Sequence, residues 1–207
     1  MLITLDELYN KYNLNVKGVL HVGAHECEEL SAYMNKGITA DKIYWIDALQ
    51  EKVNKMLNSG IPNVYNAIID EENDKEVVFN VTNNGQSSSI LDFGSHSTHH
   101  PHVHVTDTFK EKTIRLDTFI EKNQIPIENI NMLNLDIQGV ELRALRSMEK
   151  YLKHIDYIYT EVNTEYVYKD CALLSELDEY LNLHGFIRMS TRMAGNYGWG
   201  DAFYMRK

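Results

Sequence analysis

Short apolar runs that end in a small or acidic residue alternate along this chain with stretches whose apolar residues recur at helical spacing. The run at residues 18–24 ends in Val-Gly-Ala, and the run at residues 42–47 ends in Asp47. Parallel strands need a long crossover connection, which a helix supplies, so repeated strand–helix units indicate a parallel sheet. This alternation predicts an α/β fold.

The pattern predicts a definite order of elements. We expect strands at residues 18–22, 42–47, 64–69, 76–81, 131–136 and 157–162, a closing hairpin from 185–189 and 202–205, and helices at 4–12, 26–36, 51–59, 113–122, 141–152 and 173–184. Residues 1–16 would form a helical cover on the core. The polar stretch 82–107 is too long for an ordinary connection, so we expect a substrate loop there. At 207 residues the chain suits a single domain, residues 1–207.

Charge and composition limit the classes of partner that this chain is expected to bind. The net charge of -10 would repel a phosphate backbone, so nucleic acid is not expected as a partner. Cys27 and Cys171 are the only cysteines and lack metal-ligand spacing, which favours a reducing, cytoplasmic setting. No run of 18 apolar residues occurs, so no contact with a membrane is expected.

The ends of the predicted strands carry the candidate cofactor site. In open parallel sheets, ligands bind outside the carboxyl ends of the strands. Gly23 follows the first strand, and Asp47 lies 24 residues later, close to the spacing at which an acid accepts hydrogen bonds from a ribose. The further glycines of a dinucleotide fingerprint are absent near Cys27, so an NAD-dependent oxidoreductase is disfavoured against S-adenosylmethionine.

Several segments in order resemble the FkbM-type methyltransferase family over roughly residues 17–206. The segments are residues 21–26, Asp47, 66–70, 87–89, 115–117 and 135–142, of which Leu-Asp-Ile-Gln-Gly-Val-Glu-Leu is the most specific. The resemblance implies a Rossmann-like class I methyltransferase fold: a mostly parallel, seven-stranded sheet with helices on both faces and a reversed last strand. It also implies S-adenosylmethionine as methyl donor and O-methylation of sugars or other secondary metabolites. Two positions depart from the family pattern, His21 where Asp is usual and Gln138 where Glu is usual.

The resemblance also assigns site residues. The implied cofactor-binding residues are His21, Gly23, Ala24 and His25 for the methionine end, Asp47 and Ala48 for the ribose, Ala67, Ile68 and Asp70 for the adenine, and Asp136 beside the sulfonium. Ser88, within the serine-rich turn after Gly85, is a further candidate for binding cofactor or sugar.

Methyl transfer needs an aligned acceptor and a group that removes its proton. Asp136 and Glu161 end adjacent predicted strands and are the candidate catalytic residues. No metal site is assigned. Two sets of side chains could nevertheless bind a divalent metal: His99, His100, His102 and His104 in the loop, or Asp136 with Glu161.

These features together predict an S-adenosylmethionine-dependent O-methyltransferase that acts on a hydroxyl of a sugar, glycan or glycosylated metabolite. The chain length also suggests that it belongs to a larger glycan-synthesis protein. The alternative is a non-catalytic nucleoside- or glycan-binding module on the same fold. The presence of both Asp47 and Asp136 favours the enzyme, because a degenerate site would need neither acid.

Overall fold

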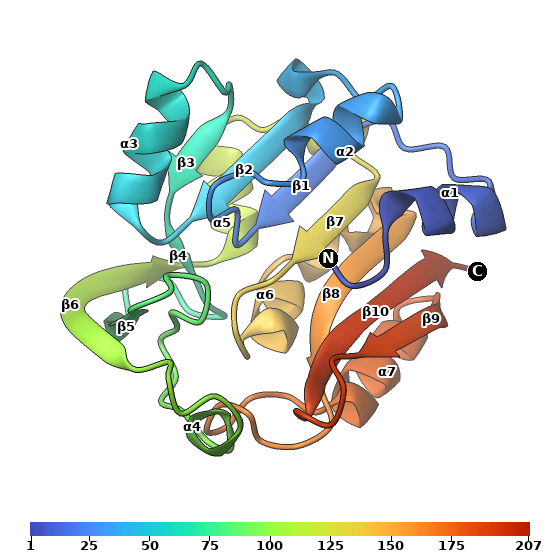
Figure 1. Cartoon of the computed structure of the whole chain (residues 1–207). Helices are drawn as coiled ribbons and strands as arrows, with labels where there is room; N and C mark the ends of the chain where they lie inside the picture. The colour runs from blue at the N-terminus through green and yellow to red at the C-terminus, as the bar shows by residue number, and fades with distance from the viewer.

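A seven-stranded sheet forms the centre of the computed structural model, which describes residues 1–207 (Figure 1). Its strand order is β3-β2-β1-β7-β8-β10-β9. The strands are β1 (Val19–Val22), β2 (Ile43–Asp47), β3 (Val64–Asn66), β7 (Met132–Leu135), β8 (Tyr157–Asn163), β9 (Phe186–Met193) and β10 (Trp199–Arg206). All pairings from β3 to β8 are parallel, whereas β10 runs antiparallel to both β8 and β9. This confirms the predicted sheet with its reversed last strand.

Helices cover both faces of this sheet. They are α1 (Leu5–Tyr12), α2 (Leu30–Asn35), α3 (Gln50–Asn58), α5 (Leu116–Lys122), α6 (Glu141–Ser147) and α7 (Leu174–Leu183), with short 3-10 turns η1 (Ala40–Lys42), η2 (Ile127–Asn129) and η3 (Glu149–His154). A further short helix, α4 (His96–His99), lies in the polar segment 82–107 and away from the faces of the seven-stranded sheet (Figure 1). No helix is both long enough and apolar enough to span a bilayer.

Two hydrophobic clusters lie on opposite faces because successive side chains of a strand point to opposite sides. On β1, Leu20 joins the cluster that includes α5, α6 and α7, whereas Val19 joins the cluster that includes α1, α2 and α3. The residues of β7 divide in the same way, with Leu133 on the first side and Met132 on the second. The sheet is therefore covered by packed helices on both sides.

The first helix begins as the sequence predicted. Thr4 and Glu7 form a capping box, in which the Thr4 hydroxyl accepts from the Glu7 amide and the Glu7 carboxylate accepts from the Thr4 amide. Leu5 and Leu8 are buried in the second cluster, so α1 covers the core as expected.

A second sheet corrects three sequence predictions. It consists of β4 (Ile68–Ile69), β5 (Glu76–Thr82) and β6 (Val105–Ile114) in the order β4-β6-β5. The predicted strand 64–69 is in fact two strands in different sheets, divided at Ala67. The helix predicted from residue 113 begins only at Leu116, because residues 113 and 114 pair with β4. The predicted substrate loop ends at His104, where β6 follows, and it contains α4.

The order of the strands places the candidate site. From β1 the chain continues to β2 and β3 on one side of β1, and it later returns to β7 on the opposite side of β1. The carboxyl ends of β1 and β7 therefore flank a switch in strand order. Figure 1 shows the arrowheads of both strands pointing toward the second sheet and α4. A ligand at this edge would lie between the two sheets.

Candidate active site

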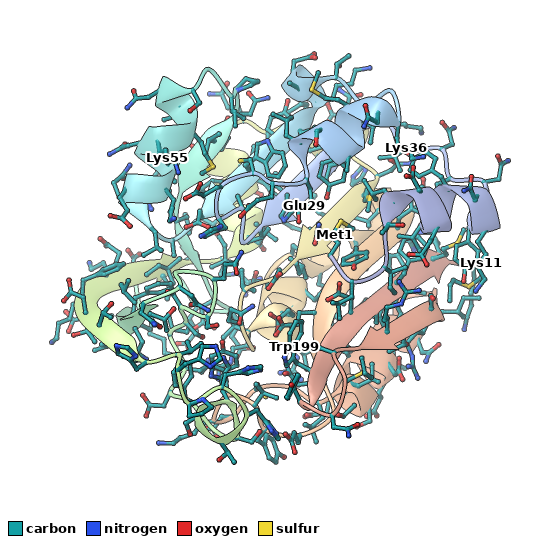
Figure 2. The ribbon with its side chains drawn as sticks, viewed as in Figure 1. Met1, Lys11, Glu29, Lys36, Lys55 and Trp199 are labelled. Carbon is teal, nitrogen blue, oxygen red and sulfur yellow. The ribbon has the colours of Figure 1, made fainter.

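A cavity of about 540 Å³ opens at the carboxyl ends of the central strands and is lined by 36 residues. These come from the turns after β1, β2 and β7, from β8 and β10, and from the loop between β5 and β6. Met1, Glu29 and Trp199, which line it, lie around the middle of the view in Figure 2. The volume is typical of small-molecule sites.

The turn after β1 is tightly held by its neighbours. A Cβ on Gly23 would lie 1.8 Å from the Asp136 carbonyl oxygen, and the backbone there has φ 91°, so only glycine fits. The amides of Gly23 and Ala24 both donate to the Ile46 carbonyl, at 2.9 and 3.0 Å. The first full helix after β1, α2, starts only at Leu30. The amides of Gly23 and Ala24 are therefore already bonded within the protein, although both residues line the cavity.

Asp47 stands at the end of β2 with both carboxylate oxygens facing the turns. Oδ2 accepts from the His25 amide at 2.7 Å, and Oδ1 accepts from the Leu49 amide at 2.8 Å. Burial raises its pKa, while the two amides oppose the rise. Each oxygen keeps a further lone pair, so the carboxylate is oriented and can still accept hydrogen bonds from a diol.

His21 lines the cavity, but its ring packs against protein groups. It lies 4.9 Å from the Trp45 ring and 3.3 Å from the Tyr33 hydroxyl, and Asn134 is a further partner. Burial lowers its pKa to about 3, so the ring is neutral at pH 7. Where the family pattern has an aspartate, this chain therefore has a neutral side chain that is already bonded to protein groups.

The other predicted cofactor residues divide into two groups. His25, Ala48, Ala67, Ile68 and Ser88 line the cavity. Asp70 does not line it: its carboxylate is fully buried, accepts from the Glu71 amide at 2.8 Å, and lies 3.5 Å from Lys75 and 3.8 Å from Arg143. The structure does not bring Asp70 to the cavity, because this residue follows Ile68 and Ile69, which pair with β6 of the second sheet.

Asp136 and Glu161 meet at the other end of the cavity through Gln138. The Gln138 Nε2 donates to Asp136 Oδ1 at 2.6 Å and to Glu161 Oε2 at 2.9 Å. Its Oε1 accepts from the Tyr168 hydroxyl at 2.6 Å, and its carbonyl accepts from the Ser89 hydroxyl at 2.8 Å. These contacts fix the orientation of the amide and leave both of its hydrogens for the carboxylates.

Crowding of negative charge perturbs these acids. Asp136 is exposed within the cavity, but the surrounding protein removes part of its hydration; this desolvation, and then the Asp201 carboxylate, raise the pKa of Asp136 to about 6. Burial and then Asp136 raise the pKa of Glu161 well above its usual value. Burial also raises the pKa of Glu141 to about 7, although this carboxylate accepts from the amides of Ile137 and Gly139. Perturbed carboxyls of this kind in a cavity are typical of proton-transfer sites.

The sequence reasoning missed Gln138 as a bridging group, and it missed Tyr168 and Asp201. Asp201 lies directly opposite Glu161 in the antiparallel pairing of β10 with β8, and it accepts from the Tyr159 hydroxyl and the Leu2 amide. Only the register of β10 brings these two acids together. The departure of Gln138 from the family pattern was the one available signal for its role.

The histidine-rich segment packs over this end of the cavity. His96 stacks on Phe93 with ring centroids 4.2 Å apart, His99 pairs with Glu165, and His100 lies 4.8 Å from the Tyr197 ring. His96, His100 and His102 line the cavity, whereas His99 and His104 do not. The structure brings no three His, Cys, Asp or Glu side chains together in a metal-holding group.

Comparison with known proteins decides the family. The model of the methyltransferase FkbM domain matches residues 21–188. The chain belongs to the FkbM methyltransferase family. The match contains every predicted site residue, Glu161 included. Among curated proteins, none matches this FkbM chain.

Solved structures show the same fold at low identity. The FkbM methyltransferase of Methylobacillus flagellatus KT is 13% identical with a TM-score of 0.57, and the match covers 95% of this chain and 46% of that protein. A putative tRNA (m1A22) methyltransferase, Sp1610 of Streptococcus pneumoniae, is 12% identical with a TM-score of 0.52, covering 97% and 68%. The magnesium protoporphyrin IX methyltransferase of Synechocystis PCC 6803, solved with bound SAM, is 10% identical with a TM-score of 0.51, covering 97% and 74%.

These comparisons confirm the predicted family and the class I fold of S-adenosylmethionine-dependent methyltransferases. This FkbM chain spans less than half the length of its Methylobacillus relative.

Proposed function

We propose that this FkbM protein is an S-adenosylmethionine-dependent O-methyltransferase whose acceptor is a hydroxyl of a sugar, glycan or glycosylated metabolite. One observation carries the proposal: a single cavity joins an oriented strand-end carboxylate, Asp47, to a pair of carboxylates with raised pKa, Asp136 and Glu161. The first suits a ribose, and the pair suits removal of a proton from an alcohol.

The Asp47 end of the cavity fits an adenosyl group. Leu49, Ala67, Ile68 and Phe79 supply apolar lining, and the Asp47 carboxylate has free lone pairs beside them. A flat base needs an apolar slot and a ribose diol needs a fixed acceptor, so the residues present suit both parts. When bound, S-adenosylmethionine supplies a methyl group on a positively charged sulfur. Asp70 does not line this cavity.

The Asp136 end fits an acceptor alcohol. An alcohol loses its proton as its oxygen is methylated, so a carboxylate with a pKa near the working pH can receive that proton. Asp136 and Glu161 are the carboxylates in place, and Gln138 holds both at hydrogen-bond distance from one nitrogen. Trp199 offers a ring against which a sugar face can pack.

Calorimetric titration with S-adenosylmethionine, S-adenosylhomocysteine and NAD tests the cofactor. We expect both adenosyl compounds to bind at micromolar concentration and NAD not to bind. Asp47→Asn should weaken both about tenfold or more, because a hydrogen bond to a charged acceptor contributes about 1.5–3 kcal/mol. The matched control is Asp107→Asn, which changes an exposed acid on β6.

Either of two results would defeat the proposal: tighter binding of NAD than of the adenosyl compounds, or the absence of adenosyl binding in a folded protein. Circular dichroism of each variant separates loss of binding from loss of fold, since Asp47 also accepts two backbone hydrogen bonds.

A further inference from the structure

The cavity is negatively charged without any compensating side chain of fixed positive charge. Its 36 lining residues contain neither lysine nor arginine, although the chain has 20 of them. The lining acids are Glu28, Glu29, Asp47, Asp136, Glu161 and Asp201. Figure 2 shows the labelled lysines on the outer helices and turns of the molecule, and two of them are paired there, Lys36 with Asp6 and Lys55 with Glu26. The cationic group that the lining does contain is the Met1 ammonium, which lies 3.7 Å from Glu29 Oε1. A positively charged group on a ligand would complement the acids that remain without a cationic side chain.

Glu161 is a buried acid with one carboxylate oxygen that no protein group bonds. Its side chain is only 5% exposed, its Oε2 accepts from Gln138, and its Oε1 accepts from no protein group although the residue lines the cavity. Asp201 stands directly opposite it across β8 and β10, an arrangement of like charges that is unfavourable by itself. A buried carboxylate with a free oxygen toward a cavity calls for a donor, and a charged donor gives the strongest bond.

An aromatic ring completes the same end of the cavity. Trp199 lines it, whereas the Tyr168 ring is only 1% exposed and packs against Phe93 and His96, with its hydroxyl 2.6 Å from Gln138 Oε1. Aromatic faces attract ammonium ions, and carboxylates pair with them. A phosphate would be repelled at this end, because the carboxylates of Asp136, Glu161 and Asp201 lie there and no cationic side chain does.

We propose that the acceptor alcohol carries a protonated amine and no phosphate, as an amino sugar does, and that Glu161 and Asp201 bind its ammonium group. This inference rests on the proposed O-methyltransferase function and names the substrate class of the same site. The cofactor's own ammonium does not explain Glu161 and Asp201, since the turn at Gly23 and Ala24 that is assigned to the methionine end lies on the other side of Asp136, after β1.

The same contacts explain why oxygen is the atom methylated. An amine nitrogen held between carboxylates stays protonated, so it has no lone pair with which to attack the methyl group. The oxygen of a neighbouring hydroxyl still has its lone pairs. In the transfer, the acceptor O–C bond forms as the C–S bond breaks, the electron pair of that bond goes to sulfur, and the hydroxyl proton goes to Asp136. The products are an O-methyl amino alcohol and the thioether form of the cofactor.

Titrations into protein saturated with S-adenosylhomocysteine test the inference, because this product leaves the acceptor end free. The probes are glucosamine, N-acetylglucosamine, glucose and glucosamine 6-phosphate, with 2-aminoethanol and ethylene glycol as a pair independent of sugar shape, all in buffer with a chelator. We expect each amine to bind at least tenfold more tightly than its uncharged counterpart and the phosphate ester to bind more weakly than glucosamine. Glu161→Gln should reduce the preference for amines about tenfold, while Asp107→Asn leaves it unchanged.

Equal binding of amine and uncharged probes, preference for the phosphate ester, no binding of any amine, or amine binding only after Mg²⁺ is added would overturn the inference. The initial titration with S-adenosylhomocysteine keeps the two proposals apart. Failure at that step defeats the proposed function and this inference together, whereas product binding without a preference for amines defeats this inference alone.

Discussion

Gln138 illustrates how one side chain sets the charge of the site. Its amide donates to Asp136 and Glu161 and so stabilises both in the ionised form. In Gln138→Glu a third carboxylate would replace the donor, and the cluster would take up protons. Groups whose pKa is raised by folding lose stability as the pH rises, so the variant should be destabilised at pH 8 by about 1–2 kcal/mol relative to the native protein, and less at pH 5.

Thermal unfolding across this pH range measures the effect. Gln86→Glu is the matched control, since it adds the same charge to the same cavity at an exposed residue with no side-chain bond to these acids. Equal pH dependence of the two variants would contradict the role assigned to Gln138.

At the scale of elements, the segment 93–104 is docked onto the segment after β8. Phe93 forms a β-bridge with Tyr168, the Ser95 hydroxyl donates to Glu165 at 2.8 Å, and His99 pairs with the same carboxylate. Backbone bonds from the amides of Gly94, Ser95 and His96 also join the two segments, so the bonds of Glu165 are part of a larger set of contacts. Glu165→Gln should weaken the two bonds to this carboxylate and increase amide hydrogen exchange over residues 95–103 several-fold.

Hydrogen exchange followed by mass spectrometry of peptides checks this, with Glu111→Gln on β6 as the control. The peptides of β7 and β8 should be unchanged. Unaltered exchange at residues 95–103 would show that the backbone bonds and the packing of Phe93 on His96 hold the segment without Glu165.

At the scale of the whole molecule, the acids of the cavity reduce stability at neutral pH. Asp136 has an ordinary pKa of 3.8 and a folded value of about 6, so the folded state binds more protons between these values. Stability is therefore lost as the pH rises from about 4 to 6 and stays lost at pH 7. Asp136→Asn should raise stability at pH 7 by about 1 kcal/mol after allowance for solvent reaching this carboxylate, or roughly 2–4 °C in Tm, and much less at pH 4.

Calorimetric unfolding at both pH values provides the measurement, and Asp107→Asn serves as the control. The same substitution should abolish methyl transfer, because it removes the proton acceptor. A loss of stability at pH 7 would show that the Asp136 carboxylate is structural.

Local pattern was sufficient for most of the fold. Hydrophobic periodicity, the Thr4 cap and the turn at Gly23 each act over a few neighbouring residues, so the main strands, most helices and the positions of Asp47 and Asp136 were predictable from sequence. The second sheet was not, because β4 and β6 pair residues 68–69 with 113–114 and neither segment shows this partnership in its own pattern.

The site divides in the same way. The sequence alone predicted that Asp47, Asp136 and Glu161 lie near the ends of strands, which a parallel sheet brings to one edge. In the structure Asp47 ends β2, Asp136 follows β7, and Glu161 lies two residues before the end of β8. Only the tertiary structure decided that Asp70 leaves the site with the second sheet, that Gln138 bridges two acids, and that Asp201 faces Glu161. The reason is physical: these contacts depend on register and on a left-handed backbone at Gln138 (φ 57°), which arise only when distant segments pack.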